Sequence, residues 1–264
     1  MSGSGIFEVY KFNEAEILLF VLALVRISSL LVVLPIFGHK QVPVPVKILL
    51  SLVITMVIFP SVRSSMPVVS GWKVDFIVYA LREAFMGITL GYLGRLTFMA
   101  VEVAGQILGF SLGFNAGQLL NPASGESGNV LDQFYVILAM LLFLAIDGHH
   151  QFFVALYKSF QVAPLAKMTI NPLAMQSVSH VISEVFVIGV KLSAPMMAVI
   201  LFSNMAMGII GRAVPQVNVF IVSFSVNVIV GLAVLIVSVP LTLAVMQQDF
   251  GNITGEMFKF LKGF

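Results

Sequence analysis

Long apolar stretches with almost no charged residue limit this chain to a small set of folds. Of its 264 residues, 59% are hydrophobic and 10% are charged, whereas about 25% of the residues of a typical soluble domain are charged. A soluble fold cannot cover so much apolar surface. Because a membrane-spanning helix takes about 20 residues plus a connection, this length accommodates about six spans. The sequence therefore predicts an all-α, polytopic integral membrane protein with a single membrane domain over residues 1–264.

The charged, histidine and cysteine residues argue against several other classes of function. The net charge is only +2 and the 14 Lys and Arg residues are scattered, so we expect no nucleic-acid binding. The chain has no Cys, and its 4 His residues lack acidic companions at metal-ligand spacing, so we expect neither a metal nor a cofactor. The motifs of nucleotide-binding loops, serine hydrolases and zinc proteases do not occur in the sequence, and we expect no catalytic residue.

We expect about six apolar helices, most of them separated by polar or Pro-containing connections. They cover residues 16–37, 47–60, 74–100, 130–146, 178–210 and 217–246. Only residues 211–216 separate the last two, which therefore form an antiparallel hairpin. Both are longer than the roughly 30 Å hydrocarbon layer and must tilt, bend or project from it. Pro195 and Pro240 are the natural kink points.

Residues 101–120 are also apolar, and a Gly recurs there at every fourth position from Gly105 to Gly117. A helix face without side chains allows another helix to approach closely, which is the packing interpretation. The alternative is a bent segment at a crowded pore axis, where only small residues fit. The Asn121-Pro122 pair directly after this row of glycines adds weight to the second interpretation, but the sequence alone leaves both open.

Ionisable side chains inside the apolar stretches are costly to bury in lipid unless they are paired or face water. The residues of this kind are Arg26, Glu83, Arg95, Glu102, Glu184 and Lys191. Neighbours on a helix point about 100° apart, so of Arg82 and Glu83 one finds its partner elsewhere in the structure. We interpret the group as ion pairs within the chain or between subunits, in preference to a proton relay. His149 and His150, beside Asp147, fit capping and solvation of a helix end better than a metal site.

Several short motifs, in this order and at this spacing, carry a resemblance that covers essentially the whole chain. They are Arg26, the turn at residues 35–47, the stretch from Ala104-Gly105 to Asn121-Pro122, Asp147-Gly148-His149, Pro195, and Gly211-Arg212-Ala213-Val214-Pro215-Gln216. With these motifs the chain resembles the FliR family of flagellar export proteins, which has a counterpart in virulence type III secretion systems.

The resemblance implies a fold and a set of partners. It implies a P-like helical part over residues 1–176, followed by a Q-like long helical hairpin and a C-terminal tail over residues 177–264. It also implies a hetero-oligomer with FliP and FliQ homologues, FlhB and FlhA. This assembly passes unfolded flagellar proteins through the bacterial inner membrane at the flagellar basal body.

The resemblance further implies an internal plug in the channel. Its residues are Phe110, Gly113, Phe114, Gly117, Leu119, Leu120, Asn121 and Pro122. The residues that we expect in subunit contacts or ion pairs are Arg26, Glu83, Lys191, Arg212, Pro215 and Gln216. Among the latter, Arg212 and Gln216 flank the tight turn of the predicted hairpin, where polar groups are concentrated amid apolar sequence.

Three other functions remain as alternatives. The first is the same role in a virulence secretion system. The second is a secondary transporter, which needs paired intramembrane acids and matching discontinuous helices; Glu102 and Glu184 are candidates, but no internal repeat is visible. An intramembrane enzyme is the least favoured, because the sequence offers no nucleophile with a base and no metal ligands.

Overall fold

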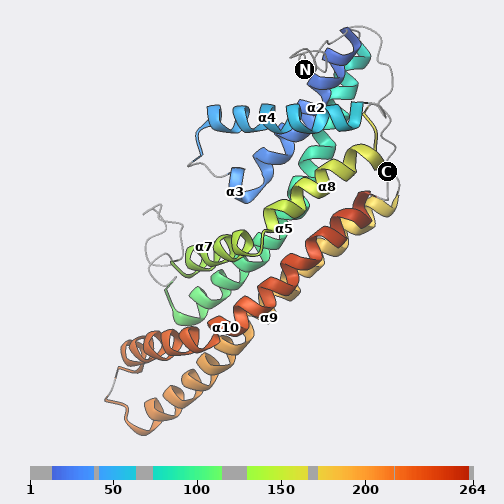
Figure 1. Ribbon diagram of the computed structural model, residues 1–264. Coiled ribbons are helices and arrows are strands. Elements are labelled where there is room, and N and C mark those ends of the chain that lie inside the picture. The colour runs from blue at the N-terminus through green and yellow to red at the C-terminus, as the bar shows by residue number, and fades with distance from the viewer. Residues whose placement is uncertain are drawn as a thin grey trace. The chain divides into compact units, whose positions relative to one another are not determined.

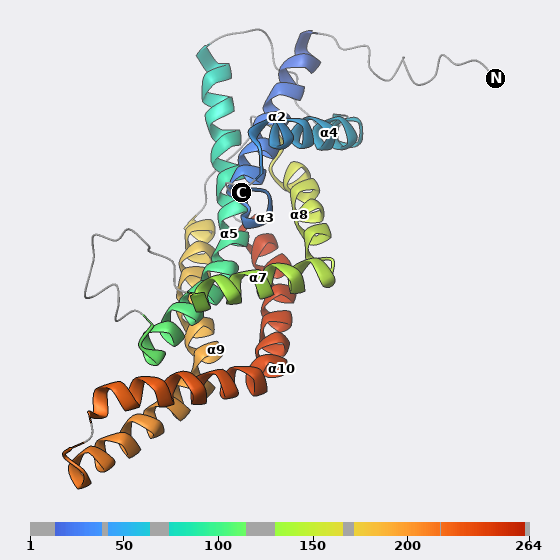
Figure 2. The ribbon, with the colours of Figure 1, turned by 90° about the vertical axis from the view of Figure 1, so that its left-hand side faces the viewer.

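The computed structural model describes residues 14–38, 42–63, 74–114, 130–165, 172–216 and 218–261, and all regular structure in these ranges is helical. The helices are α2 (Glu14–Val33), α3 (Pro35–Gly38), α4 (Val44–Val62), α5 (Val74–Leu112), α7 (Val130–Ala145), α8 (Gly148–Val162), α9 (Pro172–Ala213) and α10 (Val219–Leu261). Figures 1 and 2 show them in two views.

Five of the described helices, α2, α4, α5, α9 and α10, are long and apolar enough to cross a membrane. Helices α7 and α8 pass the same test only together, and a bend of 71° separates them, so that the count rises to six if this pair is one span. The all-α membrane fold is therefore confirmed.

The described helices differ from the sequence prediction in extent and in one additional helix, and α9 begins at Pro172 instead of residue 178. Helix α5 continues to Leu112 instead of ending near Ala100, and α10 continues to Leu261 instead of ending at Met246. The extension of α10 keeps an apolar face, since Phe250 and Met257 are buried along it. The connection after Asp147 forms helix α8, because its apolar residues recur at helical spacing.

The chain divides into two compact units, each built from several separate segments. The first comprises residues 1–95, 149–180 and 253–264, and the second comprises residues 96–148 and 181–252. These units are defined by packing. The predicted division at residue 176 concerns likeness to other subunits and stays a prediction.

Within the first unit, α4 lies across α2 (Figures 1 and 2). Phe20 of α2 and Phe59 of α4 meet edge to face, with ring centroids 5.4 Å apart. Ser51 and Thr55 share the buried side of α4 with Phe59, whereas Val57 is 71% exposed. Each hydroxyl donates to a carbonyl one turn earlier in the same helix, at 2.7 Å for Ser51 and 2.6 Å for Thr55.

The second unit has an aromatic centre and a long hairpin. Phe98 of α5, Phe143 of α7 and Phe250 of α10 are buried together, with ring centroids 5.1 to 5.4 Å apart. Figure 2 shows the predicted antiparallel hairpin of α9 and α10. Pro195 and Pro240 lie inside these two helices.

Candidate functional site

A cluster of buried polar groups surrounds Arg26 in the first unit. The Arg26 Nε donates to Oε2 of Glu83 at 2.5 Å. Its two terminal nitrogens donate to the carbonyl oxygens of Ser159 and Ala163, each at 3.0 Å. The guanidinium also lies over the ring of Phe160, 4.6 Å from the centroid. We call these five residues the Arg26 cluster.

The Arg26 cluster joins α2, α5 and α8. It supplies hydrogen-bond and charge partners to Arg26 and Glu83, which would be costly to bury alone. Arg26 and Glu83 are almost fully inaccessible to solvent, and a buried charge is tolerated when it is paired and hydrogen-bonded. The carbonyls of Ser159 and Ala163 lie at the C-terminal end of α8, where the helix dipole attracts a cation; the Ser159 oxygen also accepts from the N–H of Ala163 at 3.0 Å. All three guanidinium nitrogens are occupied, so the cluster fits a structural role.

Glycines of α5 bring α2 close to this cluster, and the sequence analysis did not single them out. A Cβ at Gly87 would collide with the backbone of Arg26, and a Cβ at Gly91 would lie 2.8 Å from the carbonyl oxygen of Leu30. This spacing of small residues permits close helix approach. The two Gly residues four positions apart, at 87 and 91, are the sequence feature that could have predicted this close approach.

The first part of the predicted plug lies at the C-terminal end of α5. Gly113 has a φ of 81°, its N–H donates to the carbonyl of Phe110 at 3.1 Å, and the N–H of Phe114 donates to that of Gly109 at 3.1 Å. This is a glycine helix cap, which needs a left-handed residue. Phe110 is 64% exposed and lies on α5, so the segment is helical up to Leu112, and the role of Phe110 in a plug stays a prediction.

The end of α5 is held against α10 within the second unit. The side chain of Leu112 fills the space where a side chain at Gly231 would lie, and a Cβ on Gly113 would lie 3.2 Å from the ring of Phe224. Leu112 is buried. Earlier in the same row of glycines, a Cβ at Gly105 would collide with the backbone of Asp132, so Gly105 serves packing within the chain.

The other predicted plug residues fall outside the described part of the chain. They are Gly117, Leu119, Leu120, Asn121 and Pro122. Their role in a plug stays a prediction.

The predicted contact residues of the hairpin turn are all on the surface. Arg212, Pro215 and Gln216 are exposed, and α9 ends with the N–H of Val214 donating to the carbonyl of Ile210 at 2.8 Å. The turn therefore presents its polar groups to the surroundings of the chain.

Lys191, on α9, is exposed. Asp249, on α10, is half-buried. The Oδ2 of Asp249 is enclosed and has no hydrogen-bond partner among the described residues. Arg95 and Glu102, on α5, are exposed.

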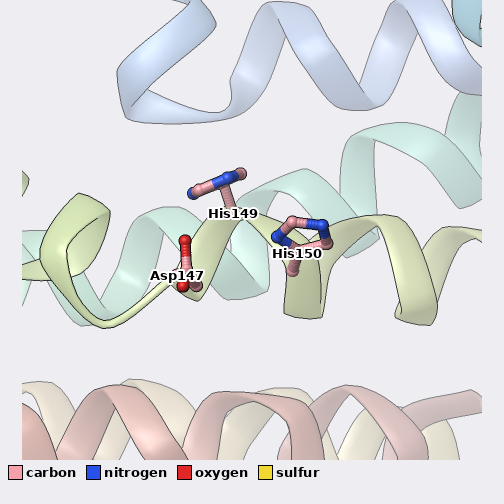
Figure 3. A group of neighbouring side chains, drawn as sticks. All are labelled: Asp147, His149 and His150. Carbon is pink, nitrogen blue, oxygen red and sulfur yellow. The ribbon is translucent and has the colours of Figure 1, made fainter.

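Asp147, His149 and His150 gather at the turn between α7 and α8 (Figure 3). One ligand atom from each lies within 4.8 Å of the others, and it is the one such group in the described part of the chain. Tetrahedral zinc with bonds of 2.0–2.1 Å needs ligand atoms roughly 3.4 Å apart, a separation that falls within this 4.8 Å limit. The absence of a metal site stays a prediction.

Comparison with known proteins finds one matching family and several relatives that share one name. Residues 17–253 match the family described as bacterial export proteins, family 1. The flagellar biosynthetic protein FliR of Escherichia coli (strain K12) is 30% identical over 231 residues, which are 87% of this chain and 87% of that protein. The protein of the same name from Bacillus subtilis (strain 168) is 28% identical over 248 residues, 92% of this chain and 93% of that protein. The one from Aquifex aeolicus (strain VF5) is 27% identical over 252 residues, with 96% and 97% covered.

Proposed function

The chain belongs to the bacterial export proteins, family 1, and from this premise we propose that it is a structural and gating subunit of the flagellar type III protein-export channel. The observation that carries the proposal is the end-to-end match to proteins named for flagellar biosynthesis, such as the 96% coverage with the Aquifex aeolicus protein. The chain then acts as a conduit component, and other subunits supply the energy for export.

We propose that the protein assembles in the bacterial inner membrane with FliP and FliQ homologues, FlhB and FlhA. The exposed apolar surfaces of its long helices support assembly with other membrane chains: for example, Phe202 of α9 and Ile229 of α10 are each 69% exposed. Lipid covers what the partners leave free.

We propose that residues 110–122 close this channel at rest. Apolar constrictions gate by excluding water, and the exposed Phe110 and Phe114 supply suitable side chains at the described start of the segment. The glycine cap at Gly113 supports a change of chain direction there.

Gene deletion in the bacterium of origin tests the function. We expect the deletion to abolish secretion of hook and filament proteins into the medium, and a plasmid copy to restore it. Normal flagellar secretion in the deletion strain contradicts the proposal. Loss of a different set of secreted proteins, with motility intact, assigns the chain to a virulence system.

A further inference from the structure

Four polar side chains form a hydrogen-bonded ladder between α9 and α10 in the charge-free part of the hairpin. The hydroxyl of Ser203 donates to Oδ1 of Asn227 at 2.8 Å. Nδ2 of Asn227 donates to Oδ1 of Asn204 at 2.7 Å, and the hydroxyl of Ser223 reaches the same oxygen at 3.5 Å. The carbonyl oxygen of Asn204 thus receives two donors, which fills both of its lone pairs.

The amide nitrogen of Asn204 takes no part in these hydrogen bonds. Asn204 is exposed, and within the described residues no acceptor is seen for its two N–H groups. The surrounding stretch of α9, from residue 192 to residue 211, carries no charge and is about 30 Å long at 1.5 Å per residue, which is about the thickness of the hydrocarbon layer. An unsatisfied amide is costly at such a depth, because lipid tails offer no acceptor.

The neighbours of Asn204 on α9 form a surface that admits a close approach. Residues three or four positions apart share a helix face, so Leu201, Asn204, Gly208 and Arg212 lie along one side. Leu201 is 59% exposed, and a Cβ on Gly208 would meet nothing within 4 Å. We call these four residues the Asn204 face.

We propose that the Asn204 face binds a transmembrane helix of a different subunit, which passes close to Gly208 and accepts a hydrogen bond from the Asn204 amide through a backbone carbonyl or a hydroxyl oxygen. Interhelical contacts in membranes combine small residues with such polar bonds. The same face of a second copy does not suit this role, because the Asn204 oxygen it would present already has two donors. The inference rests on the proposed function, since that function supplies the partner subunits.

Gly208→Leu is the first test, because it adds bulk to the face without touching the polar ladder. The open space at Gly208 means that the chain itself loses no contact, and Leu is the better helix former. The chain is expressed with the other export subunits of its bacterium, and the complex is purified through a tag on this chain. We expect the yield of complex per chain to fall about fivefold or more, the scale of a lost interhelical contact.

Two variants serve as matched tests. Ala206→Leu adds bulk on the opposite side of α9, at another exposed position, and should leave the yield unchanged. Asn204→Asp keeps the oxygen that Asn227 and Ser223 use but removes the amide donor, so it should lower the yield as Gly208→Leu does. Normal yield for Gly208→Leu, or an equal loss for Ala206→Leu, overturns the proposal.

Crosslinking identifies the occupant of the Asn204 face. A photoreactive phenylalanine analogue at Leu201 should form an adduct that mass spectrometry maps to a transmembrane helix of another export subunit. Adducts with lipid alone, or with a second copy of this chain, overturn the proposal. Because the chain has no native Cys, a Gly208→Cys variant carries a single thiol; its reaction with a water-soluble maleimide in the intact complex would show a water-lined surface and also overturn it. Failure of the unaltered chain to join any export subunit would instead refute the proposed function.

Discussion

Arg26 and Glu83 are 57 positions apart in the sequence and form an ion pair in which both side chains are fully buried, with Nε 2.5 Å from Oε2. Breaking such a pair on one side leaves an uncompensated charge, which costs about 3–5 kcal/mol. Glu83→Leu and Arg26→Met should each destabilise the protein by this order. The double variant should lose less than the sum, because no charge is then left alone.

Thermal unfolding of the purified assembly in detergent measures these effects. Arg82→Gln serves as control, because Arg82 is adjacent to Glu83 in the sequence and exposed. If the destabilisation of the double variant equals the sum of the two single destabilisations, Arg26 and Glu83 do not stabilise each other, and the predicted role of the ion pair is wrong.

Gly231 should tolerate a side chain only when Leu112 is shortened. A side chain at position 231 would collide with Leu112, and overpacking of this kind costs about 1–3 kcal/mol. Gly231→Leu should therefore lower the melting temperature, and Leu112→Ala in the same chain should recover part of the loss. A Gly231→Leu variant that is as stable as the unaltered protein would contradict the packing described for the end of α5.

Gly113 should be replaceable by Asn at lower cost than by Ala. Its φ of 81° lies in the left-handed region, where a residue with a Cβ pays about 1–2 kcal/mol and Asn pays less. Both side chains begin with the same Cβ, which lies 3.2 Å from the ring of Phe224, so this contact is common to the two variants. Equal melting temperatures for Gly113→Ala and Gly113→Asn would argue against the left-handed cap.

Deleting residues 115–120 should raise ion leakage through the assembled channel and slow growth, while assembly survives. The deletion spares Leu112, whose burial makes it part of the packing of the chain. Leakage is followed by the decay of membrane potential in cells that express the assembly. Leu112→Ala is the control, because it weakens packing without shortening the segment. A deleted channel as tight as the intact one would return residues 110–122 to a packing role.

Arg212→Ala should reduce recovery of the partner complex without unfolding the chain. Arg212 is exposed at the end of α9, so its removal costs the chain little, whereas a subunit contact through its guanidinium would be lost. The amount of co-purified FliP and FliQ homologues measures the effect. Unchanged recovery together with unchanged export would make the turn a solvated loop.

The sequence predicted the long apolar helices but neither their full extent nor the presence of α8. Apolar stretches with few charged residues locate α2, α4, α7, α9 and α10, because lipid or other apolar surfaces surround such helices. The apolar stretch of residues 101–112 was kept apart from the preceding helix because of its row of glycines, whereas the structure continues α5 through it. A Cβ at Gly105 would collide with the backbone of Asp132, a packing contact that the sequence does not reveal.

The contacts between side chains of different helices were the hardest feature to predict from the sequence. Arg26 and Glu83 were both singled out, but their pairing depends on how α2 crosses α5, which the glycines at 87 and 91 permit. Asn204 and Asn227 were not singled out, because their contact depends on the exact register of the hairpin. A search for charged residues in apolar helices overlooks Asn and Ser, although such residues form the hydrogen bonds between α9 and α10.

Helix α4 turns its hydroxyl-bearing side toward α2 and its most apolar side chains outward. In water the hydrophobic effect would reverse this orientation, whereas in lipid it costs nothing. Ser51 and Thr55 donate to their own helix, so they require no partner on α2, and the docking relies on packing contacts such as that between Phe20 and Phe59. The consequence is an order of events in folding: α4 must enter an apolar medium before it packs, so membrane insertion comes first and tertiary structure follows.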